Sequence, residues 1–171
     1  MEGPQTAEWG PALWGLLHML GEKSGRGSGV MRQMGRGPAQ LCHSEERRVW
    51  ATLFAALRTS LPCPLCKQHY VDYVRTNPPD AFLRIPGPEW ATALRQWLWT
   101  FHNAVRTRKE QALDVPQEEL AGRYVPNGTQ FAAWKQTMQE HMRRGMFLRW
   151  LIREDMLRTL QALEQLWLLS G

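Results

Sequence analysis

Residues 61–73 read LPCPLCKQHYVDY, which places two thiols on one short turn. Pro62 and Pro64 bracket Cys63, and proline favours the opening of a helix because it has no N–H to lose there. Cys63 is therefore predicted at the N-cap or N1 position of a helix, with Cys66 in its first turn. There the unpaired N–H groups and the helix dipole stabilise a thiolate and lower the thiol pKa. The stretch favours reversible redox chemistry over a structural disulfide.

Composition limits the classes of protein to which the chain can belong. Its 171 residues are 43% apolar and carry a net charge of +5, which fits one packed domain plus an appendage. This charge does not by itself indicate nucleic-acid binding, and three cysteines exclude a disulfide-rich secreted scaffold. No run of about 18 apolar residues is present, and the N-terminus lacks the layout of a signal or transit peptide. We therefore expect no membrane and no nucleic-acid partner.

Apolar residues recur with the 3.6-residue period of a helix, and strand patterns are almost absent, which predicts an all-α fold. Helices are expected at residues 11–20, 44–61, 64–76, 89–109, 116–124, 130–144 and 146–169. Residues 22–43 are rich in glycine and arginine, so a mobile basic loop is expected there. An RNA-binding arm is the less favoured interpretation of this loop. His43 and His141 are expected to be solvated.

The pattern divides the chain into a core at residues 1–125 and a C-terminal helical extension at residues 126–171. The apolar side chains of residues 146–169 are too many for one solvated helix, and burial of each large one is worth about 1.5–3 kcal/mol. Three surfaces could cover these apolar side chains: the chain's own core, a second copy of the chain, or a membrane surface. The membrane is the least favoured, because acidic residues dilute the basic face that such a helix needs.

Two further motifs accompany residues 61–73. The first is Trp-Gly-Pro-x-x-Trp-x-x-x-His at residues 9–18, and the second is a Trp-containing segment that runs through His102 and Asn103 to Val105. In this order and spacing, the sequence resembles the Erv/ALR family of FAD-linked sulfhydryl oxidases over about residues 8–124. The resemblance implies a four-helix bundle with a short fifth helix, which holds FAD beside a redox-active disulfide.

The resemblance also implies roles for individual residues. Cys63 and Cys66 would be the catalytic pair, with Cys63 the outer sulfur and Cys66 facing the flavin. Arg106 stands where the family's HNxVN motif has its second asparagine, and we expect it to contact a ribose or pyrophosphate oxygen. The full set of residues expected to bind FAD is Gly10, Trp14, His18, Tyr70, His102, Asn103, Arg106 and Tyr124.

The implied function is an FAD-dependent thiol oxidase that forms disulfides in protein substrates and passes the electrons to dioxygen, giving hydrogen peroxide. A homodimer is the expected assembly, which makes a second copy the expected cover for the extension. The family's longer-spaced cysteine pair and a shuttle CxxC are absent, as in the reduced versions carried by large DNA viruses. The expected location is the cytoplasm, that of the host if the protein is viral, with the mitochondrial intermembrane space as the alternative.

A non-enzymatic zinc-binding module is the alternative function. Cys63, Cys66 and His69 with Cys42 or His43 would supply four ligands. Zinc is disfavoured because such sites draw their ligands from two well-separated knuckles, so no metal is expected. Cys42 is instead expected to be a free or intermolecular thiol.

Overall fold

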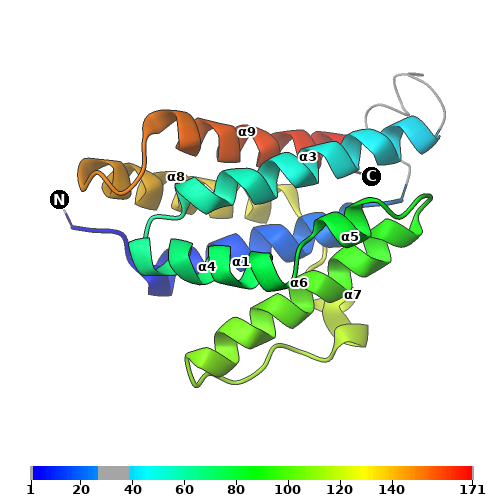
Figure 1. Cartoon of the computed structure of the whole chain (residues 1–171), viewed down its shortest axis with the longest axis horizontal. Coiled ribbons are helices and arrows are strands. Elements are labelled where there is room, and N and C mark those ends of the chain that lie inside the picture. Colours follow the sequence, from blue (N-terminus) through cyan, green and yellow to red (C-terminus); the bar gives the residue numbers. More distant parts are fainter. Residues whose placement is uncertain (1, 27–38, 171) are drawn as a thin grey trace.

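The computed structural model describes residues 2–26 and 39–170, although for residues 39–42 it describes the backbone alone (Figure 1). Within these residues the chain forms eight α-helices, one 3-10 helix and no strand, which confirms the all-α prediction. The α-helices are α1 (Thr6–Lys23), α3 (Ala39–Ser60), α4 (Pro64–Thr76), α5 (Asp80–Leu83), α6 (Glu89–Arg108), α7 (Leu120–Arg123), α8 (Gly128–Phe147) and α9 (Arg153–Leu169), and the 3-10 helix is η1 (Gln117–Glu119).

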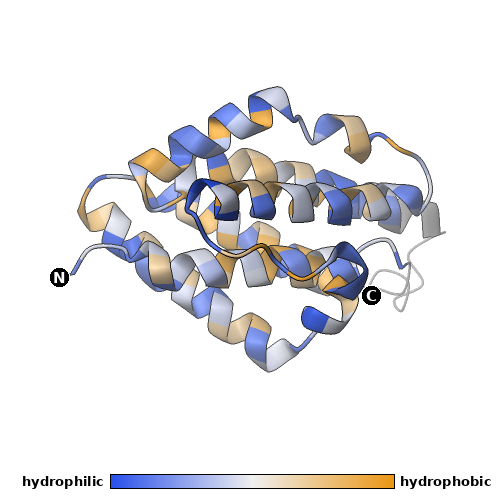
Figure 2. Cartoon of the chain, turned by 90° about the horizontal axis from the view of Figure 1, so that it is seen from below, coloured by the Kyte–Doolittle hydropathy of each residue, from blue (hydrophilic) through white to orange (hydrophobic). Residues whose placement is uncertain are grey.

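Helix α1 packs against α6 and α8, while α3 packs against α4 and α9. Figure 1 shows α1, α3, α8 and α9 along the long axis of the molecule, with α6 crossing below them. Each long helix has an apolar and a polar face (Figure 2), and the apolar faces meet in one core. The largest fully buried side chains come from α1, α3, α6, α8 and α9: Trp50, Trp90, Leu16, Met19, Leu20, Leu53, Leu57, Leu94, Leu98, Met138, Met142 and Leu163.

Helix α1 is longer at both ends than the predicted residues 11–20. It begins at Thr6, and Pro11 lies inside it, where its missing N–H removes one backbone hydrogen bond. Packing of the preceding turn outweighs this loss, because Trp9 is buried in the core. Gly21 does not end the helix. A Cβ there would lie 3.1 Å from Leu98, so the glycine allows α1 and α6 to approach closely.

The loop expected at residues 22–43 is shorter at both ends. Residues 22 and 23 end α1, and residues 39–43 begin α3, so Ser44 is inside a helix and is not its N-cap. Ser24 follows α1 and is buried, with its Oγ donating to the carbonyl of Leu20 at 2.7 Å. The middle of the expected loop, residues 27–38, lies outside the described residues.

The central part of the chain follows the sequence prediction more closely. Helices α4 and α6 have almost the predicted bounds, and the predicted fifth helix is the pair η1 and α7. The prediction missed α5, one turn inside the proline-rich connection between α4 and α6.

The C-terminal extension is part of the same core. Helix α8 packs on α1 and α9 packs on α3, so the chain's own core buries their apolar faces, rather than the expected second copy of the chain. Polar contacts fix the arrangement, since the hydroxyls of Ser60 and Thr159 hydrogen bond at 2.6 Å between α3 and α9. The Lys23 ammonium also donates to the carbonyl of Trp167 at 3.0 Å.

The prediction of solvated histidines was wrong for both residues. His43 and His141 are buried, at 7% and 1% exposure. His141 Nδ1 accepts from the Gln5 amide at 3.0 Å and its Nε2 lies 2.9 Å from a Glu8 carboxylate oxygen, so it joins α8 to the start of α1. Among the described helices, none is long and apolar enough to cross a bilayer.

Candidate active site

Cys63 and Cys66 form a disulfide at the N-terminus of α4, with their Cα atoms 5.2 Å apart. Cys63 is the N-cap residue and Pro64 the first residue of the helix, as the sequence predicted. The Cys66 amide donates to the Cys63 sulfur at 3.1 Å. An amide N–H at a helix N-terminus favours a thiolate on that sulfur when the disulfide opens.

On the Cys66 side, the disulfide borders a cavity between α1, α3, α4 and α6. Cys66 lines this cavity and Cys63 does not. The empty space within it is about 620 Å³, which includes open solvent, and its walls are mostly apolar. The wall includes four large side chains on α1 and α6 and two rings on α4: Trp9, Leu13, Trp14, Phe101, His69 and Tyr70. The Tyr70 hydroxyl points away from solvent and donates to the carbonyl of Phe54 at 2.6 Å.

A second, more polar cavity adjoins the first. Gly10 and Trp14 line both, so the two cavities meet at these residues of α1. The second has an empty volume of about 1360 Å³, which includes open solvent, and it carries three cationic side chains: Arg106, Lys109 and Arg123. Its remaining walls include His102, Tyr124 and Trp134, the last from α8 of the extension.

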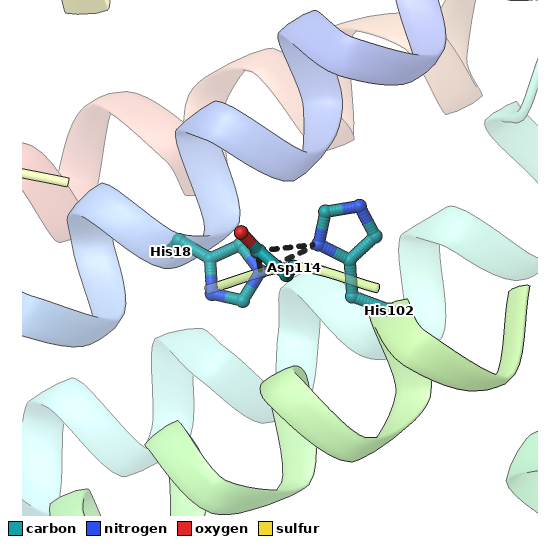
Figure 3. A group of neighbouring side chains, drawn as sticks. All are labelled: His18, His102 and Asp114. Carbon is teal, nitrogen blue, oxygen red and sulfur yellow. Dashed lines mark hydrogen bonds and ion pairs between the residues drawn. The ribbon is translucent and has the colours of Figure 1, made fainter. Parts of the chain in front are cut away.

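His18, His102 and Asp114 converge at one edge of the second cavity (Figure 3). His18 Nε2 lies 2.9 Å from His102 Nδ1, and an Asp114 carboxylate oxygen lies 3.2 Å from the same His102 nitrogen. Arg106 Nε donates to His102 Nε2 at 3.0 Å. Because a guanidinium only donates, the neutral His102 carries its proton on Nδ1, which faces two acceptors, His18 Nε2 and the Asp114 carboxylate.

Burial keeps both histidines neutral. It lowers the pKa of His18 to about 3, with help from His102, and lowers the pKa of His102 to about 4, with help from Arg106. Burial would raise the pKa of Asp114, but hydrogen bonds from the Tyr124 hydroxyl and the Val115 amide outweigh it and leave that pKa below its usual value. The cluster therefore consists of two neutral imidazoles beside one carboxylate.

The ten predicted site residues lie in one connected region. Gly10, Trp14, Cys66 and Tyr70 line the first cavity, and His102, Arg106 and Tyr124 line the second with Gly10 and Trp14. Cys63 is on the outer side of the disulfide. His18 and Asn103 do not line either cavity. His18 stacks on Tyr124 with ring centroids 4.4 Å apart, and Asn103 Oδ1 accepts from the Asp114 amide at 2.8 Å.

Sequence reasoning missed Asp114 and Trp134 as site residues. Asp114 holds His102 and Tyr124 together, but a single acidic residue before a proline-led helix is typical of a cap. Trp134 lies against the backbone of α1, where a Cβ on Gly15 would be 2.6 Å from its ring. Its place depends on how α8 docks on α1, which no motif in the sequence indicates.

Two of the four ligands proposed for the alternative zinc site are joined in the structure. The Cys63 and Cys66 sulfurs are bonded to each other and are not thiolate ligands, and the side chain of Cys42 lies outside the described residues. Within the described part of the chain, the one group with the spacing of metal ligands is His18, His102 and Asp114.

A disulfide at the N-terminus of a helix, beside a cavity, is an arrangement suited to thiol–disulfide exchange. The profile of the Erv1 / Alr family matches residues 11–124, so the chain belongs to this family. The family consists generally of thiol oxidases, and its members bind FAD. Searches of curated proteins and of solved structures gave no match. The family match ends before α8, so it does not include the extension.

Proposed function

We propose that the chain is an FAD-dependent thiol oxidase that forms disulfides in protein substrates. The observation that carries the proposal is the position of Cys66, on the wall of an apolar cavity that adjoins a cationic one. A disulfide so placed can exchange electrons with thiols on its outer side and with a ligand on its inner side.

The residues that line the two cavities suit FAD in their apolar character and charge. The apolar cavity suits a flat tricyclic ring, and the guanidinium and ammonium groups of the second cavity suit a pyrophosphate. The indole Nε1 of Trp9, a residue that lines the first cavity, is buried and finds no partner in the described part of the chain. FAD bound there would accept two electrons from the reduced cysteine pair and pass them to dioxygen, giving hydrogen peroxide.

The cysteines perform the exchange with substrate. A substrate thiolate attacks the Cys63 sulfur, the bond between Cys63 and Cys66 breaks, and Cys66 leaves as a thiolate. A second substrate thiolate then attacks the substrate sulfur of the mixed disulfide and releases Cys63. The substrate dithiol loses two electrons and two protons, and the cysteine pair gains them.

The helix start supports this order of attack. Cys63 is on the side away from the apolar cavity, and the Cys66 amide is aimed at its sulfur. This hydrogen bond would stabilise the Cys63 thiolate that the second step releases. No second cysteine pair exists in the sequence, so substrate thiols would reach Cys63 directly. The cytoplasm remains the proposed location.

Oxygen consumption with dithiothreitol tests the proposal. The FAD-loaded protein should consume oxygen and release hydrogen peroxide, and Cys63→Ser and Cys66→Ser should each abolish turnover. Cys42→Ser is the matched control and should keep activity within about tenfold, or about 1.4 kcal/mol in the barrier. Turnover that survives Cys66→Ser, or a wild-type protein without activity when FAD is bound, would overturn the proposal.

A further inference from the structure

Five large apolar side chains are exposed around the start of α4 and the turn between α8 and α9. They are Leu65 at 64%, Phe147 at 69%, Leu148 at 41%, Trp150 at 36% and Ile152 at 59% exposure. We call these residues the disulfide-end patch. Leu65 lies between the two cysteines, and the other four belong to the extension, outside the family match.

The turn between α8 and α9 lies directly beside the disulfide. The Lys67 ammonium donates to the carbonyl of Trp150. On the other side of the CxxC, a Cβ on Gly145 would lie 3.2 Å from Pro62. The residues that precede Cys63 and follow Cys66 therefore both contact the extension. Figure 1 shows the start of α4 and this turn at the same end of the molecule.

The turn is held in a fixed shape, so its exposed side chains have a defined surface. The Trp150 amide donates to the carbonyl of Gly145 and the Arg149 amide to that of Met146, both at 2.9 Å. This is the Schellman arrangement, with Arg149 at φ +62 in the position that usually holds glycine. Leu151, the residue after Trp150, is buried in the core and anchors the end of the turn.

The charge of the turn has one sign. Residues 141–153 contain four arginines and no acidic residue. Arg149 and Arg153 are exposed and bracket Trp150 and Ile152. The first acidic residues after the turn are Glu154 and Asp155, and Asp155 lies 3.8 Å from Arg158. A partner that matches this surface combines apolar with acidic side chains.

We propose that the disulfide-end patch docks the substrate itself, an extended segment of a protein in which apolar and acidic residues flank the reactive cysteine. This inference rests on the proposed function, because a substrate thiol must reach Cys63 past Leu65 and the turn. A second copy of the chain or a bilayer held permanently on the patch would cover that approach. The substrate segment is the occupant that position and charge together favour.

Binding of a redox-inert peptide tests the docking without turnover. The probe is a short fluorescent peptide with leucine, phenylalanine and two glutamates around a serine in place of cysteine. Full-length protein should bind it, and Phe147→Ser combined with Ile152→Ser should weaken binding at least tenfold. The matched control is Val125→Ser with Leu168→Ser, two residues exposed at 59% and 49%. These lie near the contact of Gly128 with Trp167, at the other ends of α8 and α9.

Kinetics with two substrates give a second readout. With the cysteine form of the peptide, the patch variant should lose at least tenfold in kcat/KM, mainly through KM. With dithiothreitol it should match the wild-type protein, because a small dithiol needs no docking surface. An equal loss with both substrates, or no loss with the peptide, would overturn the docking proposal.

Two further outcomes would also overturn it. If the wild-type protein sediments as a dimer and the patch variant as a monomer, the patch is a contact between copies. If the wild-type protein floats with vesicles of phosphatidylcholine and phosphatidylserine and the variant does not, the patch contacts membranes. Failure of the proposed function is distinguishable, since it removes dithiothreitol oxidation from the wild-type protein while leaving the binding of the serine peptide measurable.

Discussion

Gly10 lies on α1 where the two cavities meet, directly before Pro11. Apart from its neighbours along the chain, a Cβ on Gly10 would meet Thr6, at an ordinary 3.8 Å. In Gly10→Ala, the free energy of unfolding without FAD should change by less than about 1 kcal/mol, because the helix propensity of alanine is opposed by the contact of its Cβ with the ring of Pro11. FAD binding should weaken, because the added methyl group narrows the junction of the cavities. Urea unfolding and FAD titration measure the two effects, and unchanged FAD affinity would contradict the assignment.

Glu46 makes the pH dependence of stability testable at one residue. Burial raises its pKa to about 7, against hydrogen bonds from the Gly25 amide and the Ser170 hydroxyl. The folded chain therefore binds more protons than the unfolded chain between about pH 4.5 and 7, so Glu46 lowers stability as the pH rises through this range. His18 and His102 act in the opposite direction, since their lowered pKa values make the unfolded chain bind more protons below about pH 6.5.

The variant Glu46→Gln should remove the loss of stability that Glu46 causes as the pH rises, and leave the gain from His18 and His102. The free energy of unfolding of the wild-type protein should rise from pH 4.5 to 6.5, and that of the variant should rise more steeply, by about 1 kcal/mol per pH unit. Urea unfolding at several pH values measures both curves. Parallel curves would show that Glu46 is ionised in the folded protein throughout this range.

At the scale of helices, the sequence predicted those with clear starts and stops and missed those decided by tertiary contacts. Pro64 and the prolines after Asn77 bound α4 as predicted. Pro11 pointed to a helix start, but burial of Trp9 extends α1 to Thr6. The histidine at 141 looked solvated because its partners, Gln5 and Glu8, are more than a hundred positions away.

The candidate site divides in the same way. The residues carried by local motifs, such as the CxxC and the pair His102 and Asn103, could be named from sequence. Asp114 and Trp134 could not, because their roles depend on contacts between α1, α6, α8 and the segment before η1. The surface that buries the extension could not be predicted for the same reason, since the apolar faces of α8 and α9 do not specify which surface they contact.

Helix α9 provides a direct test of this packing. Leu163 is fully buried, so Leu163→Ala should lower the free energy of unfolding by about 2–5 kcal/mol through lost burial and a cavity. Leu168 on the same helix is 49% exposed, and Leu168→Ala should change stability by less than about 0.5 kcal/mol. Equal and small effects in urea unfolding would show that α9 does not pack on the core.

For the whole molecule, the extension and the family region should unfold together. Removing residues 126–171 would expose the faces of α1 and α3 that α8 and α9 cover, and would remove Trp134 from the second cavity. The shortened chain should aggregate and bind FAD weakly, as measured by sedimentation and FAD titration. A soluble, shortened chain with an unchanged thermal midpoint and FAD affinity would show that the family region folds without the extension.

The central claim is that the disulfide of Cys63 and Cys66 connects substrate thiols to FAD in the adjoining cavities. Anaerobic titration of the FAD-loaded protein with dithiothreitol tests it most directly. The wild-type protein should lose its blue-region absorbance as up to two dithiols are oxidised per FAD, one for the flavin and one for the disulfide, and admission of oxygen should restore it. Cys66→Ser should retain bound FAD and its absorbance under the same titration. Bleaching of Cys66→Ser at the wild-type rate, or wild-type absorbance that dithiothreitol leaves unchanged, would contradict the account.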